Sequence, residues 1–461
     1  MWAEQDPLAW QHALVEVVAS LKEQSRVAAG EVGALGFASQ VDGVVAVDAD
    51  DRPLRPAIIW MDRRAARQAA ALREGVSDDE VRAITGLNLD AYHGAPKIAW
   101  IVDEEPEVAR RTAAYLLPGA FLVARLTGER VVDHANASST MLYDITTRAW
   151  SPRMLEATGL DATQLGRVAH AREVAGPLTA DAADELGLTT TCRVVVGTGD
   201  EHGAALGAGV VRPGIVCDIT GTAEPVGVAA LEPIIDPTGL LETHGHADER
   251  AWFIENPGFV SGGSVRWFLD IVGGDEARLD AEAAAVPPGS GGVTFIPALA
   301  GSTTPRWDEH ARGVFSGLAL GHGRGHLGRA VREGCTFGLR DLVERLAELG
   351  LDSDEIRVVG GGARSSTWLR MKADATGRTV RVLDVPEATA LGAAHLAATA
   401  AGIFSDLDEA IEHSTVLGPT PYEPDPSVRA AYDDAYGTYR RIFDALEPLA
   451  LGRDRDRGGE R

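Results

Sequence analysis

The chain has 461 residues, of which 45% are hydrophobic and 24% charged, a balance typical of a globular protein with two large domains. Its 43 basic and 68 acidic residues give a formal net charge of −25, which argues against a nucleic-acid partner or an anionic membrane surface, since either favours a basic patch. The apolar runs are too short to span a membrane and the first residues do not resemble a signal peptide, so we expect a cytoplasmic protein.

The first part of the chain mixes helical and extended patterns. Apolar residues at helical spacing predict helices over residues 5–22, 63–75 and 103–114. Short apolar runs predict strands over residues 32–37, 44–47 and 57–59, with a polar break at residues 38–40. Helices that alternate with strands in this way indicate an α/β architecture.

The later part repeats this plan, with glycine-rich turns after strands. A strand at residues 194–196 runs into the glycine-rich turn 197–209, which continues as a helix. Further strands are predicted over residues 215–219, 251–255, 293–296, 356–359 and 379–383, and helices over 322–348, 367–376 and 389–400.

Two glycine-rich strand–turn–helix units in separate halves predict two related domains that face one cleft. We place the first domain at residues 1–211 and the second at 212–450, because Pro213 and Gly214 interrupt the chain near this point. Residues 451–461 have almost no apolar side chains, and we expect a disordered tail there.

Asp200 follows the strand at residues 194–196 and lies among glycines. Open α/β sheets bind ligands at the carboxyl ends of their strands, so this acid is a candidate general base or metal-associated carboxylate. An aspartate at this place can equally cap the helix that follows it. The local pattern leaves both interpretations open.

Two further turns are candidates for contact with phosphate or nucleotide. Thr220-Gly221-Thr222 ends a strand and offers backbone amides and hydroxyls, although such turns are common. Gly360-Gly361-Gly362 precedes a helix and allows a ligand to approach the backbone closely. No third glycine follows at the dinucleotide-binding spacing and no G-x-x-x-x-G-K-[ST] is present, which excludes the nicotinamide and P-loop interpretations.

Other polar residues carry weaker signals. Trp60-Met61-Asp62 closes the apolar run at residues 57–59, and by itself Asp62 reads as an ordinary turn aspartate. His244 and His246 are close in sequence but lack a third nearby ligand, so the sequence predicts no metal site there. The three cysteines are far apart and imply neither disulfides nor zinc.

Taken in order, several segments resemble the FGGY family of carbohydrate kinases, and in particular its xylulokinase-like branch. The resemblance covers residues 5–439, and its order of motifs makes it specific. The matching segments are residues 36–64, 125–144, 197–214, 219–225, 295–318, 332–341, 358–380 and 387–398.

The resemblance implies two ribonuclease-H-like domains of the actin/Hsp70/hexokinase kind, which close over a sugar and ATP with Mg²⁺. It implies that Asp200 is the general base, and it implies no protein residue as a dedicated metal ligand. The implied sugar-binding residues are Val41, Asp42, Trp60, Asp62 and Glu201. The implied ATP-binding residues are Gly221 and Thr222 at the γ-phosphate, Gly361, Gly362, Ala363 and Ser366 at the adenosine, and Gly321 as a further contact.

The departures from the family pattern bear on substrate and activity. The Met-His-Gly of xylulokinases is Val41-Asp42-Gly43 here, which is closer to polyol kinases of the erythritol type. The Asp-x-Gly-Thr turn that opens the family pattern is not found near residue 1. We therefore expect either an upstream start or a truncated form, which would be inactive or nearly so and would expose an apolar strand edge at residues 32–37.

The expected reaction is ATP-dependent phosphorylation of a small ketose or polyol, most simply D-xylulose to D-xylulose 5-phosphate. The alternatives are a kinase of an erythritol-type polyol or of another pentulose, and a catalytically inactive sugar- or nucleotide-binding protein. An actin-like ATPase without a small substrate is disfavoured by the segment 36–64. The expected partner is a small molecule rather than nucleic acid or membrane, and the sequence leaves a homodimer open.

Overall fold

The computed structural model describes residues 2–447. The N-terminal half has ten helices among its described residues: α1 (Pro7–Ser25), α2 (Ala66–Gly75), α3 (Asp78–Thr85), α4 (Gly94–Glu104), α5 (Pro106–Arg111), α6 (Pro118–Thr127), α7 (His134–Ser138), α8 (Pro152–Thr158), α9 (Ala180–Leu186) and α10 (Asp200–Gly207). Its strands are short: β1 (Glu4–Gln5), β2 (Ala34–Leu35), β3 (Ala38–Ser39), β4 (Val45–Val47), β5 (Ala57–Ile58), β6 (Ala114–Leu116), β7 (Val131–Asp133), β8 (Tyr143–Asp144), β9 (Ala149–Trp150), β10 (Arg167–Ala169), β11 (Val174–Pro177), β12 (Arg193–Val195) and β13 (Thr198–Gly199).

The C-terminal half has longer elements. Its strands are β14 (Ile215–Ile219), β15 (Ala223–Ala230), β16 (Glu242–Gly245), β17 (Trp252–Val260), β18 (Thr294–Ile296), β19 (Val314–Ser316), β20 (Glu355–Val359) and β21 (Thr379–Val382). Its helices are α11 (Gly262–Val272), α12 (Glu276–Ala284), α13 (Arg324–Glu348), α14 (Ser366–Thr376), α15 (Ala388–Ala401), α16 (Leu407–Ser414) and α17 (Arg429–Leu446).

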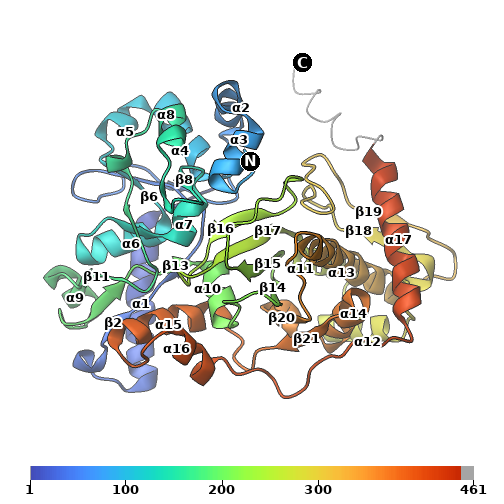
Figure 1. Cartoon of the computed structure of the whole chain (residues 1–461). Helices are drawn as coiled ribbons and strands as arrows, with labels where there is room; N and C mark the ends of the chain where they lie inside the picture. The colour runs from blue at the N-terminus through green and yellow to red at the C-terminus, as the bar shows by residue number, and fades with distance from the viewer. Residues whose placement is uncertain (1, 448–461) are drawn as a thin grey trace.

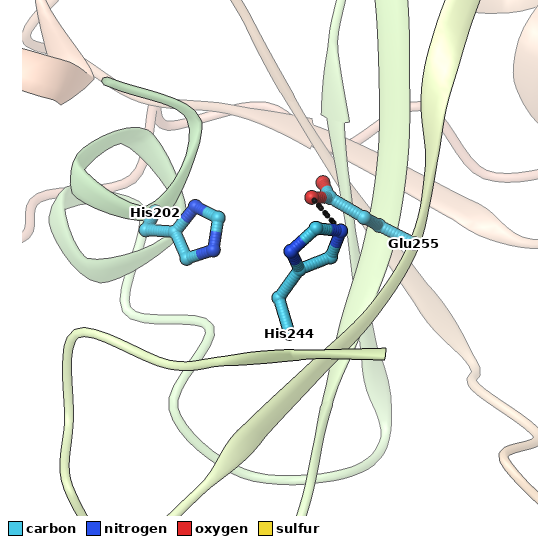
Figure 2. A group of neighbouring side chains, drawn as sticks. All are labelled: His202, His244 and Glu255. Carbon is cyan, nitrogen blue, oxygen red and sulfur yellow. Dashed lines mark ion pairs between the residues drawn. The ribbon is translucent and has the colours of Figure 1, made fainter. Parts of the chain in front are cut away.

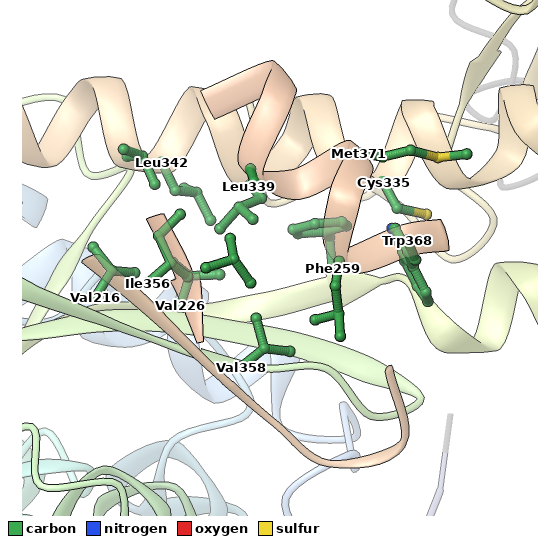
Figure 3. Close-up of a cluster of buried hydrophobic side chains, with 14 of the residues drawn as sticks. Val216, Val226, Phe259, Cys335, Leu339, Leu342, Ile356, Val358, Trp368 and Met371 are labelled. Atoms are coloured by element: carbon green, nitrogen blue, oxygen red, sulfur yellow. The ribbon is translucent and has the colours of Figure 1, made fainter. Parts of the chain in front are cut away.

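The C-terminal half is built on one six-stranded sheet in the order β16-β17-β15-β14-β20-β21. β14 pairs antiparallel with β15 on one side and parallel with β20 on the other, and β21 continues the parallel side. The central strands are apolar because both of their faces are covered. Helices α13 and α14 lie over one face, where Cys335, Leu339 and Leu342 recur at helical spacing and meet the strand side chains (Figure 3).

In the N-terminal half, strands pair in small groups. β12 pairs parallel with β2 and antiparallel with β11, so β2 lies at the edge of this three-stranded sheet. β13 pairs parallel with β3, and β4 pairs antiparallel with β6. Helix α15 comes from the C-terminal half but lies beside β2 and α10 (Figure 1).

Helices α10 and α15 join the two halves at very close range. A Cβ on Gly207 would lie 2.0 Å from the carbonyl oxygen of Ala388, and one on Gly392 would lie 2.0 Å from the carbonyl oxygen of Gly203. Only glycine permits this backbone-to-backbone approach. The two halves are therefore held together where α15 crosses α10, the helix that begins at Asp200.

The structure confirms the predicted α/β class and most predicted elements, with some corrections. The expected helix at 103–114 is instead the end of α4, the short α5 and the start of β6, because Pro106 begins a new helix. The expected polar break at 38–40 contains β3, whose pairing with β13 overrides its polar side chains. Among the elements that were not predicted are helices α3, α6, α11, α12 and α17 and strands β15 and β16.

The predicted tail at 451–461 lies outside the described residues. Within residues 2–447, none of the helices combines the length and the apolar character that crossing a membrane requires.

Candidate active site

Asp200 and Asp42 lie beyond the ends of two paired strands. β13 and β3 run parallel, with Thr198 opposite Ala38 and Gly199 opposite Ser39. Since the carboxyl ends of parallel strands meet at one edge, the residues that follow them, Asp200 and Asp42, come together there. The sequence placed these acids 158 positions apart, and only the strand pairing makes them neighbours.

The structure bears on the helix-cap interpretation of Asp200, while its role as a base stays a prediction. The cap of α10 is Gly199, and Asp200 is the first helical residue. One carboxylate oxygen of Asp200 accepts a hydrogen bond from the Glu201 amide at 3.1 Å. The helix-cap interpretation is therefore wrong, and most of the carboxylate's hydrogen-bonding capacity is left for a ligand.

Negative charge accumulates around Asp200. Burial raises the pKa of Asp200 above its ordinary value, backbone amides oppose this shift, and the charge of Asp42 adds to it. Burial also raises the pKa of Glu201 well above its usual range, and Glu255, Asp200 and Asp42 raise it further. A carboxylate whose pKa is raised in this way is a better proton acceptor than an exposed aspartate.

Asp42 is held in a strained and buried position. Its side chain is 5% exposed, and its φ of 57° lies in the left-handed region that non-glycine residues rarely adopt. Nδ1 of His93 lies 3.2 Å from its carboxylate, and Nζ of Lys97 donates to its backbone oxygen at 2.7 Å. Neither His93 nor Lys97 stands out in the local sequence pattern; the one available signal is that Lys97 is one of three lysines in the chain.

The remaining residues expected at the sugar differ in their surroundings. Val41 packs against Gly199, the residue before Asp200, since a Cβ on Gly199 would lie 2.6 Å from Val41 Cγ1. Trp60 is about half exposed, at 47%. Asp62 is fully buried, and its oxygens accept from Arg64 at 2.7 Å and from the Ala3 amide. The turn-aspartate interpretation therefore describes Asp62, whose carboxylate is already occupied by the chain.

The structure brings the two predicted nucleotide-binding turns together. β14 and β20 are parallel neighbours, so the turn at Gly221 and the turn at Gly361–Arg364 emerge at the same sheet edge. The Gly362 amide donates to the Thr220 carbonyl at 3.0 Å, and a Cβ on Gly362 would lie 2.4 Å from Thr220 Cγ2. Ala363 lies in the same short 3₁₀ turn, and Ser366 is the first residue of α14.

Two further segments bear on nucleotide binding: the turn at Gly321 and the start of α11. Gly321 lies in an exposed turn ahead of α13, and a Cβ there would meet nothing within 4 Å. The amides of Gly262 and Gly263 at the start of α11 donate to the carbonyls of Gly221 and Thr222, each at 3.0 Å. The glycine pair at the beginning of a helix was the signal for this support, and the sequence analysis did not use it.

A cluster of histidine and glutamate lies behind Asp200. The sequence offered no third ligand near His244 and His246, but the structure places His202 of α10 and Glu255 of β17 beside His244 (Figure 2). Their ligand atoms all lie within 4.8 Å of one another, and all three residues are buried. His246 is not part of this group, because both of its ring nitrogens are bonded to backbone atoms.

Comparison with known proteins places these features in a family. The model of the FGGY family of carbohydrate kinases, N-terminal domain, matches residues 1–207, and the model of its C-terminal domain matches residues 218–401. A xylulose kinase of Escherichia coli is 33% identical over 97% of this chain and 92% of its own length. A glycerol kinase of Gloeobacter violaceus is 34% identical over 89% of this chain and 82% of its own length. The crystal structure of a xylulose kinase from Rhodospirillum rubrum superposes with a TM-score of 0.88 at 30% identity, covering 97% of this chain and 91% of that one.

Proposed function

The chain belongs to the FGGY family of carbohydrate kinases, which use ATP, and from this premise we propose that it phosphorylates a hydroxyl of a small ketose, with D-xylulose as the first candidate. The observation that carries the proposal is the meeting of Asp200 and Asp42 at one strand edge, with the strained backbone of Asp42 beside it.

On the sugar side, Asp200 accepts the proton of the attacking hydroxyl. A positioned general base of this kind contributes roughly 10²–10⁴-fold to the rate. The carboxylate of Asp42 accepts hydrogen bonds from the other hydroxyls, and the side chain of Glu201 contacts them beside it. Val41 and Trp60 supply apolar surface for the carbon chain, while Asp62 with its partner Arg64 holds the turn that carries Trp60.

On the ATP side, backbone amides and hydroxyls hold the nucleotide. Gly221 and Thr222 contact the γ-phosphate, and Gly361, Gly362, Ala363 and Ser366 border the adenosine, with Gly321 as an outer contact. The contact between the two turns supports this assignment, because it fixes both relative to the sheet. Phosphoryl transfer depends mainly on such positioning and on charge stabilisation.

The acidic group at Asp200 also fits Mg²⁺. This cation prefers oxygen ligands and keeps part of its water shell, and the Asp200 carboxylate has acceptor capacity beyond its bond to the Glu201 amide. When bound, Mg²⁺ would neutralise charge on the phosphate groups of ATP.

A polyol is the second candidate substrate. Asp42 stands where the xylulokinase pattern has histidine, and glycerol kinases match this chain about as closely as xylulose kinases do. An aspartate accepts from hydroxyls and does not donate to a ketone, so its presence favours an acceptor rich in hydroxyl groups.

A panel of acceptors tests both candidates. ADP release is followed with D-xylulose, D-ribulose, erythritol, glycerol or no acceptor, and the thermal shift caused by each acceptor is measured in parallel. We expect D-xylulose to give the highest kcat/KM, and Asp200→Asn to lower turnover by about 10²–10⁴-fold while leaving the thermal shift intact.

The panel also separates the alternatives. A higher kcat/KM for erythritol or glycerol would replace the ketose with a polyol. Acceptor-induced stabilisation without ADP release would select the inactive sugar-binding protein. No response of either kind to any acceptor would contradict the proposal itself.

A further inference from the structure

We propose that His202, His244 and Glu255 form a binding site for a divalent transition metal of the zinc class, separate from the Mg²⁺ that accompanies ATP. The three side chains come from α10, β16 and β17 and lie beside one another (Figure 2). The inference does not depend on which sugar the enzyme uses.

The sheet itself presents an unusual concentration of charge at this point. In the β16–β17 pairing, Glu242 lies directly opposite Glu255, and His244 follows two residues later on the same face. Like charges directly opposite each other destabilise a sheet, and both glutamates are 1% exposed. A cation between the strands and α10 would offset this repulsion.

Hydrogen bonds around His244 fix which ring nitrogen is free. Ser138 Oγ donates its one hydrogen to the Ala135 carbonyl at 2.6 Å and accepts from the Gly245 amide at 3.0 Å. Its remaining contact, with Nδ1 of His244 at 3.5 Å, therefore requires a hydrogen on Nδ1. Metal-binding histidines are oriented by such a bond from their other nitrogen.

The other nitrogen of His244 points at the carboxylates. Nε2 lies 3.6 Å from Glu255 and 3.8 Å from Glu242. Glu242 already accepts from the Asn88 amide at 2.9 Å and from the Tyr92 hydroxyl at 2.8 Å, so Glu255 is the carboxylate that is free to bind. Among the described residues, one oxygen of Glu255 has no hydrogen-bond partner.

His202 provides the observation that points to a metal rather than a proton. Its side chain is 1% exposed, and within residues 2–447 neither of its ring nitrogens has a hydrogen-bond partner. A protonated His244 would satisfy the two glutamates, but it would leave both nitrogens of His202 unpaired.

The donor set selects the class of metal. Two imidazole nitrogens and one carboxylate suit zinc-like ions, whereas Mg²⁺ and Ca²⁺ take oxygen ligands. Bonds of about 2.0–2.2 Å in a tetrahedral site bring the ligand atoms to roughly 3.4 Å from one another. Metal binding would therefore draw the ligand atoms closer together than their present limit of 4.8 Å.

Such a metal would join the two halves of the molecule. His202 lies on α10 within residues 1–207, while His244 and Glu255 lie on the C-terminal sheet. Since His202 is two residues from Asp200 on the same short helix, the metal would also fix the position of that acid relative to the sheet.

The test measures metal binding by the full-length protein rather than activity. The chain is stripped with a chelator, titrated with Zn²⁺ or Co²⁺ in millimolar Mg²⁺, and analysed for bound metal, cobalt absorption and thermal shift. We expect one equivalent of metal, a tetrahedral cobalt spectrum and a rise in melting temperature, with no competition from Mg²⁺.

Variants locate the site. His202→Ala and the isosteric Glu255→Gln should lose the tight equivalent, and Ser138→Ala should weaken binding by about 10–100-fold, as expected for the partner of a metal-binding histidine. The matched control is His322→Ala/His326→Ala, which removes another close histidine pair, with ring centroids 5.0 Å apart, and should bind like the parent.

Three outcomes would overturn the proposal. In the first, the parent protein binds no metal. In the second, both His202→Ala and Glu255→Gln bind metal as the parent does. In the third, the control variant loses its equivalent of bound metal, which would show adventitious binding at the surface. Circular dichroism of Glu255→Gln confirms folding, and because that variant relieves the repulsion with Glu242, it should remain folded without metal.

Discussion

Lys372 is the cation on which the turn before Gly221 depends. Its Nζ donates to Asp218 at 2.5 Å, to Thr220 Oγ1 at 2.5 Å and to Glu224 at 3.0 Å. Lys372 is 1% exposed and both acids are fully buried. Lys372→Met therefore leaves two carboxylates next to each other without a counter-charge.

The expected cost is large and depends on pH. Removing one partner of a buried ion pair costs about 3–5 kcal/mol. Burial, and then the charge of Asp218, raise the pKa of Glu224 to about 7 even with Lys372 present. Because the folded state holds this proton more tightly than the unfolded state, the contribution of Glu224 to stability falls as pH rises from about 4.3 through 7. Without Lys372 its pKa rises further, so the penalty of Lys372→Met should be full at pH 8 and smaller at pH 5.

Urea unfolding at pH 5 and pH 8, followed by fluorescence and circular dichroism, measures this penalty. Lys372→Met/Glu224→Gln should recover part of the loss at pH 8, since it removes the second charge. Lys22→Met, which removes a partly exposed lysine bound to a single carbonyl, should cost less than about 1 kcal/mol. A loss below about 1 kcal/mol for Lys372→Met at pH 8, or equal losses at the two pH values, would contradict the role of Lys372 as the counter-charge of Asp218 and Glu224.

Three further variants test the two sides of the site. Gly362→Ala should raise the KM for ATP about tenfold or more, because a Cβ there would lie 2.4 Å from Thr220 Cγ2 and overpacking costs about 1–3 kcal/mol. As a control, Gly30→Ala should leave ATP kinetics unchanged, because a Cβ on Gly30 would meet nothing within 4 Å. Burial lowers the pKa of His93, but Asp42 and Glu242 outweigh it and raise the pKa to about 10. His93 therefore stabilises the fold fully below pH 6.5, and this contribution is lost as pH rises through 10. His93→Gln should cost about 3 kcal/mol in urea unfolding at pH 6, and a stability difference between variant and parent that does not narrow by pH 10 would contradict the pairing. Asp42→His should move kcat/KM toward D-xylulose and away from polyols by about tenfold, since an unpaired buried hydroxyl partner costs about 1–3 kcal/mol; if neither class of acceptor responds, Asp42 does not contact the substrate.

The amino-acid sequence determined the features that depend on local pattern. Apolar periodicity located α1, α13, α14 and α15, and the apolar runs located β14 and β20. The ordered motifs indicated the family, which the comparisons confirmed along nearly the whole chain. The residues with a chemical signature of their own, such as Asp200 and the glycine turns, were therefore found from the sequence, and their roles stay predictions.

The tertiary structure decided how distant residues combine. Strand pairing across 158 positions brought Asp42 to Asp200, and the close approach of α10 to α15 followed from glycines whose sequence context shows no partner. It also showed that Asp62 is paired with Arg64, and that His244 has His202 and Glu255 as neighbours rather than His246. Periodicity reports which face of a strand or helix is buried, but not which other segment covers it. Side chains from three separate elements meet only when the sheet register and the helix crossing are both fixed, and these depend on packing over the whole chain.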